Sequence, residues 1–513
     1  MYVRPARLDQ WLKEFGPLVI VLIVQAAFSL RLIWTNTAFL DEATYLYAGH
    51  QMIAHWLHGI PVVEYPLSLS GSVALYPPLG AMADDLGGLT GARILSLLFM
   101  LGATTLLHGC ARRLFGRRAA AFAAILFVSL SGTQFLGAFA TFDAMALFLL
   151  VLSSYLVVRF GAERDLRGVL ISDLLAPLVL AIADATKYAT ALWNPIVIGL
   201  AFVAPIALGG ASPRQAALRA VRFTGVLVVV ILAALYGIGG SEYVRGIEVT
   251  TLNRSASMGG AQRQSATAVF QHAWTWIGFV IVLAAVAVVV LYLKDRRGWR
   301  SPLGAIGLLL LAASVAAPLN QARIGTLISL QKHVVYGAWF GCIAAGYLLA
   351  VLLRQRRVAM IVAAVVLAIL PLALSVQARG FYRWSTENPQ FIADLKPLVH
   401  AGNDRYLIEG YNDVPAYYLG TVQSEQWRDG AVGDFVYYDP VTHSVVKNGP
   451  SFAAAIKNRF FTLIIVNYTE PSDWLIKAAI ERYGDYRVLA TLPPSQVGSK
   501  RAYTVWTVVP KSG

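Results

Sequence analysis

Two adjacent carboxylates, Asp41 and Glu42, directly follow an apolar segment that runs almost unbroken from Gly16 to Trp34. The segment is long enough to cross a bilayer. A carboxylate can deprotonate a hydroxyl, and ionisable groups at a membrane boundary are costly enough to indicate a functional role. In the structural alternative, Asp41 would cap the next helix, whose first turn favours negative charge. The pair by itself leaves both interpretations open.

Further ionisable residues stand where other apolar segments begin or end. Asp143 opens one such segment, and Asp184 and Lys187 follow another; three more cations, Arg323, Lys332 and His333, lie near the start of a late one. Each has a structural alternative: a helix cap for Asp143, an ion pair between Asp184 and Lys187, and snorkelling toward lipid headgroups for the later cations. Cations in such positions can also hold a phosphate group.

The composition is that of a polytopic membrane protein. Of the 513 residues, 57% are hydrophobic and only 14% are charged, which no soluble globular domain matches. The formal net charge is +14, but the basic residues stand mostly in short loops between apolar segments, so a nucleic-acid partner is not expected. Cys110 and Cys342 fall inside predicted spans and provide neither a disulfide framework nor a metal site.

Hydropathy predicts eleven membrane spans and a consistent orientation. The spans are 17–34, 91–110, 119–136, 143–159, 169–184, 189–208, 223–239, 272–293, 303–318, 334–353 and 358–376. One alternating set of loops carries twenty Lys and Arg residues and the other carries six before the C-terminal region. The positive-inside rule then predicts a cytoplasmic N-terminus and a C-terminal region outside. The loop 35–92, which has no Lys or Arg, would face outside and carry Asp41 and Glu42 with it.

The chain divides into two predicted domains. Residues 1–376 form the polytopic α-helical domain, including a first outer loop at 35–90. Residues 377–513 are richer in charge and show alternating strand patterns at 405–409, 461–466 and 503–509, with a helical stretch at 473–483. Strands that alternate with helices predict a small extracytoplasmic α/β domain.

The first outer loop is long enough to predict a function of its own. Residues 43–57 predict a helix with one aromatic and apolar face, typical of a segment in the membrane interface. The following stretch, 68–79, exposes Gly and Ser backbone donors and fixes a turn with two prolines. A ligand-contacting loop and an ordinary surface loop both fit this stretch. The candidate ligand contacts in the loop are Tyr45, His50, Ser70 and Tyr76.

Carboxylates and cations on one side of a membrane are suited to moving a group from a lipid phosphate to an acceptor. A solute transporter would instead be expected to carry ionisable residues at mid-span, and few are present.

Several motifs resemble the bacterial relatives of protein O-mannosyltransferases and aminoarabinose transferases, which are GT-C glycosyltransferases that use a polyprenyl-phosphate sugar. The matching stretches cover nearly all of the membrane region: Asp41-Glu42, 76–79, 91–96, 111–118, 141–144, 186–188 and 329–337. The resemblance implies an integral protein of the bacterial plasma (inner) membrane.

The same resemblance implies roles for individual residues. Asp41 would be the catalytic base for the acceptor hydroxyl, Glu42 would position donor or acceptor, and Asp143 would join them in the catalytic site. The donor phosphate would bind Lys187, Arg323, Lys332 and His333. Transfer would proceed with inversion, and no cofactor is expected, although Asp41 with Asp143 could bind a divalent metal.

One departure leaves the acceptor open. The loop 240–271 holds no large domain, unlike eukaryotic protein mannosyltransferases, so an extracytoplasmic glycan, a lipid and a protein all stay as alternatives. The sugar is equally open: mannose, arabinose, aminoarabinose, galactose or another. Two other functions compete: a flippase or exporter of lipid-linked sugars that binds with the same residues, and, ranked lower, an enzyme using a lipid-diphosphate oligosaccharide.

Overall fold

The computed structural model describes residues 5–35, 37–62, 69–163, 165–252, 263–353, 376–383, 388–408, 413–420, 426–430, 435–495 and 501–510. The chain forms two compact units. The helical unit comprises Met1–Trp34, Tyr65–Tyr76 and Thr90–Phe381. The sheet unit comprises Thr35–Glu64, Pro77–Leu89 and Tyr382–Gly513.

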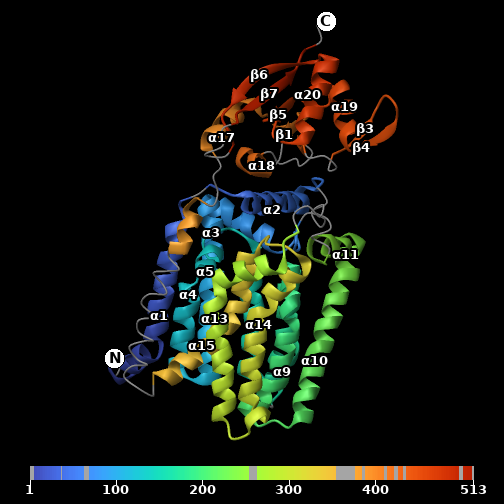
Figure 1. The fold of residues 1–513 in the computed structure, drawn as a ribbon. Coiled ribbons are helices and arrows are strands. Elements are labelled where there is room, and N and C mark those ends of the chain that lie inside the picture. Colours follow the sequence, from blue (N-terminus) through green and yellow to red (C-terminus); the bar gives the residue numbers. More distant parts are fainter. Residues whose placement is uncertain are drawn as a thin grey trace. The chain divides into compact units, whose positions relative to one another are not determined.

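Helices, most of them long and apolar, make up the helical unit (Figure 1). They are α1 (Pro5–Ile33), α3 (Tyr76–Phe115), α4 (Arg117–Ser129), α5 (Ser131–Leu136), α6 (Phe142–Phe160), α7 (Leu166–Val169), α8 (Ala176–Thr186), α9 (Asn194–Gly209), α10 (Pro213–Leu232), α11 (Gly240–Ile247), α13 (Ala266–Lys294), α14 (Pro302–Ile324) and α15 (Leu330–Leu352). Short η segments join several of them: η2 (Leu170–Leu175), η3 (Tyr188–Trp193), η4 (Ala233–Gly239), η5 (Glu248–Leu252), η6 (Gly298–Arg300) and η7 (Ala378–Arg383).

Nine helical stretches of the described chain are long and apolar enough to cross a membrane. The polytopic fold predicted from hydropathy is therefore confirmed, with two differences from the eleven predicted spans. The span predicted at 119–136 is two shorter helices, α4 and α5, because Leu130 between them has an extended backbone. The span predicted at 358–376 lies almost wholly outside the described residues.

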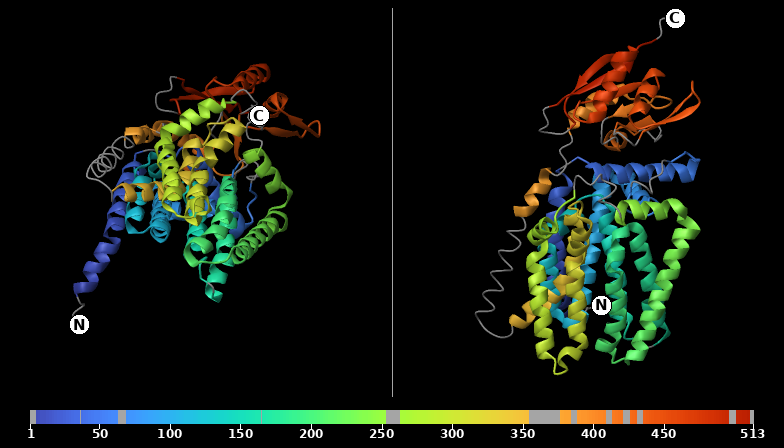
Figure 2. Two further views of the ribbon diagram at one scale, coloured as in Figure 1. Left: turned by 60° about the horizontal axis from the view of Figure 1, so that its bottom comes forward. Right: turned by 45° about the vertical axis from the view of Figure 1, so that its right-hand side comes forward.

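Small residues let the central helices of this unit approach closely. α15 packs against α4, α13 and α14 and is the most buried of the nine stretches. A Cβ added at Gly337 would lie 2.6 Å from the Ala313 carbonyl oxygen on α14, and one at Gly346 would lie 2.5 Å from the Ala119 carbonyl oxygen on α4. Close backbone approach at small residues is a common way for helices to associate in lipid. By contrast, α10 stands at the edge of this unit (Figure 2).

The sheet unit is built on a five-stranded sheet in the order β2-β1-β5-β7-β6. Its strands are β1 (Tyr406–Ile408), β2 (Trp427–Asp429), β5 (Leu463–Val466), β6 (Tyr486–Leu492) and β7 (Tyr503–Val508), while β3 (Val436–Asp439) and β4 (Ser444–Lys447) form a separate hairpin. β1 is parallel to β2 and β5, and β7 is antiparallel to β5 and β6. The predicted strands 405–409, 461–466 and 503–509 and the helix at 473–483 are confirmed as β1, β5, β7 and α20 (Pro471–Tyr483).

Both faces of this sheet are buried, as the alternation of side chains along a strand allows. On one face, Leu407 and Ile464 pack with α19 (Gly449–Lys457) and α20. On the other face, Tyr406 and Leu463 pack with α17 (Pro389–Leu395), α18 (Asp413–Leu419) and Tyr47 of α2 (Leu40–His58). A helix from the beginning of the chain therefore completes the core of the C-terminal sheet.

The two compact units divide the chain otherwise than the predicted domains 1–376 and 377–513, whose boundary stays a prediction. Most of the first outer loop belongs with the C-terminal region and not with the helical unit, because α2 packs along α18. α3 is shared between the units, and the division at Leu89 falls beside Gly87 and Gly88, whose backbones are not helical. Sequence order could not show this arrangement, since its contacts join residues far apart along the chain.

Candidate functional site

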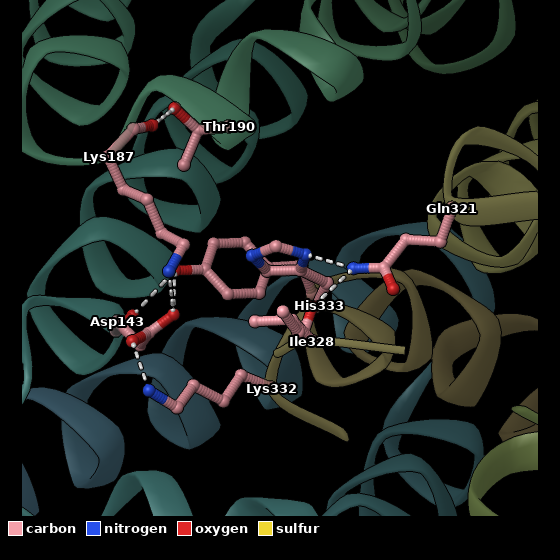
Figure 3. A network of polar contacts seen from close by, with 8 residues as sticks. Asp143, Lys187, Thr190, Gln321, Ile328, Lys332 and His333 are labelled. Atoms are coloured by element: carbon pink, nitrogen blue, oxygen red, sulfur yellow. Dashed lines mark hydrogen bonds and ion pairs between the residues drawn. The ribbon is translucent and has the colours of Figure 1, made fainter. Parts of the chain in front are cut away.

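Asp143 is the centre of a buried ion cluster in the helical unit (Figure 3). It stands in the first turn of α6, after the N-cap residue Thr141, whose side chain accepts no capping hydrogen bond. The Asp143 carboxylate does not cap the helix but receives two ammonium groups: Nζ of Lys187 at 2.5 Å and Nζ of Lys332 at 3.7 Å. Asp143 is fully buried and each lysine side chain is 3% exposed.

Lys187 stands at a break between two helical segments. It ends α8 and precedes η3 with an extended backbone, which turns its side chain away from the helix axis. The structural alternative for Lys187, an ion pair with Asp184, is not what the described residues show. The Asp184 carboxylate accepts hydrogen bonds from Thr190 and Asn194, and so holds η3 against α8.

Lys332 and His333 come from the first turn of α15. Ser329 before them has φ of 60°, and its carbonyl oxygen accepts from the backbone N–H groups of both residues. A positive φ at a residue other than glycine is strained and is found more often at functional sites. One turn further on, the Tyr336 hydroxyl donates to the backbone oxygen of Asp143 at 3.0 Å, which fixes α15 to the start of α6.

The other predicted cation, Arg323, has a different setting. Its side chain is exposed, and Nε and Nη2 donate to Oδ1 of Asn320. His333 instead lies beside Gln321 of α14, with 2.8 Å between Gln321 Nε2 and His333 Nδ1. Of the four predicted phosphate ligands, Lys187 and Lys332 share one buried carboxylate, and His333 follows Lys332 directly.

The loop that holds Ser70 folds onto the break at Lys187. Ser70 accepts from the backbone N–H of Tyr188, and Ser72 donates to the backbone oxygen of Ala185. A Cβ at Gly71 would lie 2.1 Å from the Thr186 oxygen, so only glycine permits this approach. Tyr76, the last predicted contact in this stretch, is fully buried beside Ser96.

In the sheet unit, Asp41 and Glu42 occupy the first turn of α2. Glu42 is fully buried, and its carboxylate accepts from the backbone N–H of the N-cap residue Phe39. Glu42, rather than Asp41, therefore supplies the helix-capping function that the sequence left open. Asp41 is half-buried one residue before it.

The beginning of α2 is fixed to α18 by two short hydrogen bonds. The Thr44 hydroxyl donates to Oδ2 of Asp413 at 2.6 Å, and the backbone N–H of Ala38 donates to the Tyr418 hydroxyl at 2.6 Å. One contact is made before Asp41 and Glu42 in the sequence and the other after them. The orientation of both carboxylates therefore depends on the C-terminal region.

His50 and Tyr45 lie further along α2. Nε2 of His50 is 2.9 Å from Oδ2 of Asp84, and the Tyr417 hydroxyl donates to the other oxygen of that carboxylate. This hydrogen bond to Asp84 raises the pKa of His50 against the opposing effect of burial, and burial raises the pKa of Tyr417. Tyr45 is buried.

Several site residues were not singled out from the sequence. Tyr188 and Tyr336 lay inside the motifs of the resemblance, so a signal existed for both. Gln321 lies just beyond the predicted span 303–318 and, like Asp413, carried no signal in the sequence. Among the described residues, no group of three or more His, Cys, Asp or Glu side chains is placed to hold a metal ion.

No protein-family profile and no curated protein sequence matches this chain, but solved structures share its fold. ArnT from Cupriavidus metallidurans, solved with bound undecaprenyl phosphate, is 16% identical with a TM-score of 0.58 over 96% of this chain and 98% of that one. The Archaeoglobus fulgidus oligosaccharyltransferase is 14% identical with a TM-score of 0.58, covering 89% of this chain and 70% of that one. The mycobacterial arabinofuranosyltransferase AftD is 14% identical with a TM-score of 0.52, covering 97% of this chain and 41% of that one.

The chain has the GT-C glycosyltransferase fold. The fold class predicted from the motifs is thereby confirmed. The described residues combine nine helical stretches of membrane-spanning length with a small C-terminal sheet, in agreement with that fold.

Proposed function

We propose that this GT-C protein is an inverting glycosyltransferase that moves a sugar from a polyprenyl-phosphate donor to the hydroxyl of an extracytoplasmic acceptor. The observation that carries the proposal is the buried Asp143–Lys187–Lys332 cluster within this fold. With all three groups ionised, two ammoniums and one carboxylate leave a net charge of +1. A net positive charge in a poorly hydrated interior attracts an anion strongly.

The charge of the cluster suits the leaving group. In the reaction, the acceptor oxygen forms a bond to C1 of the sugar while the bond from C1 to the phosphate oxygen breaks. The phosphate takes the electron pair of that bond, so a singly charged diester becomes a doubly charged monoester. Cations fixed before the reaction stabilise such developing charge without having to reorganise. Lys187 and Lys332 would supply this stabilisation, with His333 and Arg323 as further candidates.

Asp41 is the proposed general base, which takes the proton from the acceptor hydroxyl as the new bond forms. It is half-buried in the first turn of α2, and its neighbour Glu42 is engaged in capping. Asp143 is already bound to two cations, so its proposed role is to hold them in place. No metal is required in this scheme, and a chelator tests that part of it.

The proposal is tested by transfer with purified protein in detergent, using radiolabelled polyprenyl-phosphate mannose and arabinose, with and without chelator. Release of polyprenyl phosphate by the wild type is expected, together with a loss of about 10²- to 10⁴-fold in Asp41→Asn, the usual contribution of a general base. Donor binding should be unchanged in that variant. Binding without turnover of any donor, together with movement of the donor across vesicle membranes, would instead show a flippase.

A further inference from the structure

A cavity in the helical unit adjoins the ion cluster. It has a volume of about 250 Å³ and is lined by the loop at Ser70 and by η3, α11, η5, α14 and the start of α15. Two of its lining residues follow directly on the two lysines of the cluster: Tyr188 comes after Lys187, and His333 comes after Lys332. A phosphate held by the lysines would therefore have the cavity at its side.

Two residues that line the cavity each carry a buried polar atom that lacks a hydrogen-bond partner among the described residues. These atoms are the hydroxyl of Tyr188, a residue 7% exposed, and Oε1 of Gln321, a residue 2% exposed. Buried polar groups are almost always hydrogen-bonded, so an unpaired one indicates a partner that binds there. A ligand with hydroxyl groups would supply one to each.

The orientation of the Gln321 side chain is settled by its neighbours. Its nitrogen lies 3.2 Å from the Ile328 carbonyl oxygen, which can only accept, so Nε2 is the donor there and also toward His333 Nδ1. Nδ1 therefore accepts, which leaves Nε2 as the ring nitrogen that can donate. Figure 3 shows the Gln321 nitrogen turned toward His333 and its oxygen turned away.

We infer that this cavity binds the sugar of the donor, and that the sugar is a single uncharged ring. This inference rests on the proposed function and specifies its substrate. The size supports one ring, because cavities for drug-sized ligands begin at about 300 Å³. The apolar part of the wall, including Trp193 and Ile324, suits the C–H face of a sugar, while Tyr188 and Gln321 suit its hydroxyls.

The lining excludes a cationic sugar. None of its described residues is an Asp or Glu, and its one permanent charge is the cation Arg323. An ammonium group on the sugar would lose its water without gaining a counter-ion, which is strongly unfavourable. Lys187 and Lys332 beside the cavity would add repulsion. A neutral hexose or pentose meets none of these penalties.

The test compares donors on the wild type and on Tyr188→Phe. Two donors carry a neutral sugar: polyprenyl-phosphate mannose and polyprenyl-phosphate arabinose. They are compared with polyprenyl-phosphate 4-amino-4-deoxyarabinose and with a polyprenyl phosphate that carries a disaccharide. The better neutral donor is expected to have a kcat/KM at least about 10²-fold above the amino sugar and the disaccharide, as sites that leave polar groups unpaired commonly achieve. Equal or preferred use of the amino sugar or the disaccharide would overturn the inference.

Tyr188→Phe removes only a hydroxyl that has no partner in the described protein, so folding should be unaffected. A fall in kcat/KM of about 5- to 100-fold for the neutral donor is expected from the lost hydrogen bond. The affinity for polyprenyl phosphate without sugar should stay unchanged. Tyr347→Phe, near the other end of α15, is the matched control and should behave as wild type.

The outcomes separate the two claims. If neither Tyr188→Phe nor the charge of the sugar changes the rate of transfer, the cavity is not the sugar site, but the protein is still a glycosyltransferase. Binding of polyprenyl phosphate with no transfer from any of the four donors would refute the proposed function itself.

Discussion

Lys187 Nζ and Asp143 Oδ1 lie 2.5 Å apart, although one residue follows α8 and the other opens α6. Because both side chains are almost completely buried, the pair acts on stability as well as on binding. Removal of one member of such a pair leaves the other charge buried without its partner, at a cost of about 3–5 kcal/mol.

The first prediction separates these two roles of the cluster. Asp143→Asn should lower the thermal stability of the detergent-solubilised protein strongly. The combined variant Asp143→Leu, Lys187→Met, Lys332→Met should recover stability, because apolar groups of similar size can replace a buried ion network. It should nevertheless fail to bind polyprenyl phosphate. Binding by the stable triple variant would show that the cluster is purely structural.

The second prediction concerns the two carboxylates of α2. Glu42→Gln keeps an acceptor for the backbone N–H of Phe39 and should retain transfer within about threefold, since glutamine also serves in capping boxes. Glu42→Ala should destabilise the start of α2 by about 1 kcal/mol. Hydrogen exchange of the α2 amides and transfer rates measure both effects. A loss of transfer in Glu42→Gln as large as in Asp41→Asn would assign Glu42 a chemical role.

The third prediction concerns the dependence of α2 on the C-terminal region. Asp413→Ala removes the acceptor that α18 offers to the Thr44 hydroxyl and leaves only the Leu40 carbonyl oxygen on α2 itself, so Asp41 should be less well positioned. We expect kcat to fall by about tenfold, because small displacements of a catalytic group have large effects on rate. Donor affinity should be unchanged, and Asp439→Ala in the same unit is the control. A change confined to donor affinity would contradict this positioning role.

The fourth prediction is a pH dependence at His50. The hydrogen bond to Asp84 raises the pKa of His50 in the folded protein, and Asp85 adds to the effect. The stabilisation from protonated His50 is therefore fully present below its unfolded pKa of about 6.5 and is lost as pH rises through the folded value. Tyr417 and Glu42 are the other ionisable groups near this network.

Hydrogen exchange measured between pH 5.5 and 8.5 checks this prediction. Protection of the α2 amides around His50 should decrease as pH rises, after correction for the intrinsic exchange rate. His50→Gln should abolish the pH dependence, whereas His58→Gln on the same helix should preserve it. An unchanged pH profile in His50→Gln would refute the prediction.

The sequence alone determined the features that depend on local pattern. Long apolar runs had to become membrane-length helices, because only a helix satisfies its own backbone in lipid. Alternation at 461–466 and 503–509 predicted strands for the same kind of local reason. The placement of Asp143, Lys187 and Lys332 at helix ends was equally visible, since it depends only on where the apolar runs stop.

The tertiary structure alone decided which of these residues meet. Lys187 pairs with Asp143 and not with Asp184 three positions before it, because the break before η3 turns the lysine away from α8. α2 belongs with a sheet formed at the other end of the chain, through contacts such as Thr44 to Asp413. Side-chain pairing between distant segments depends on helix packing, and hydropathy carries no information about it.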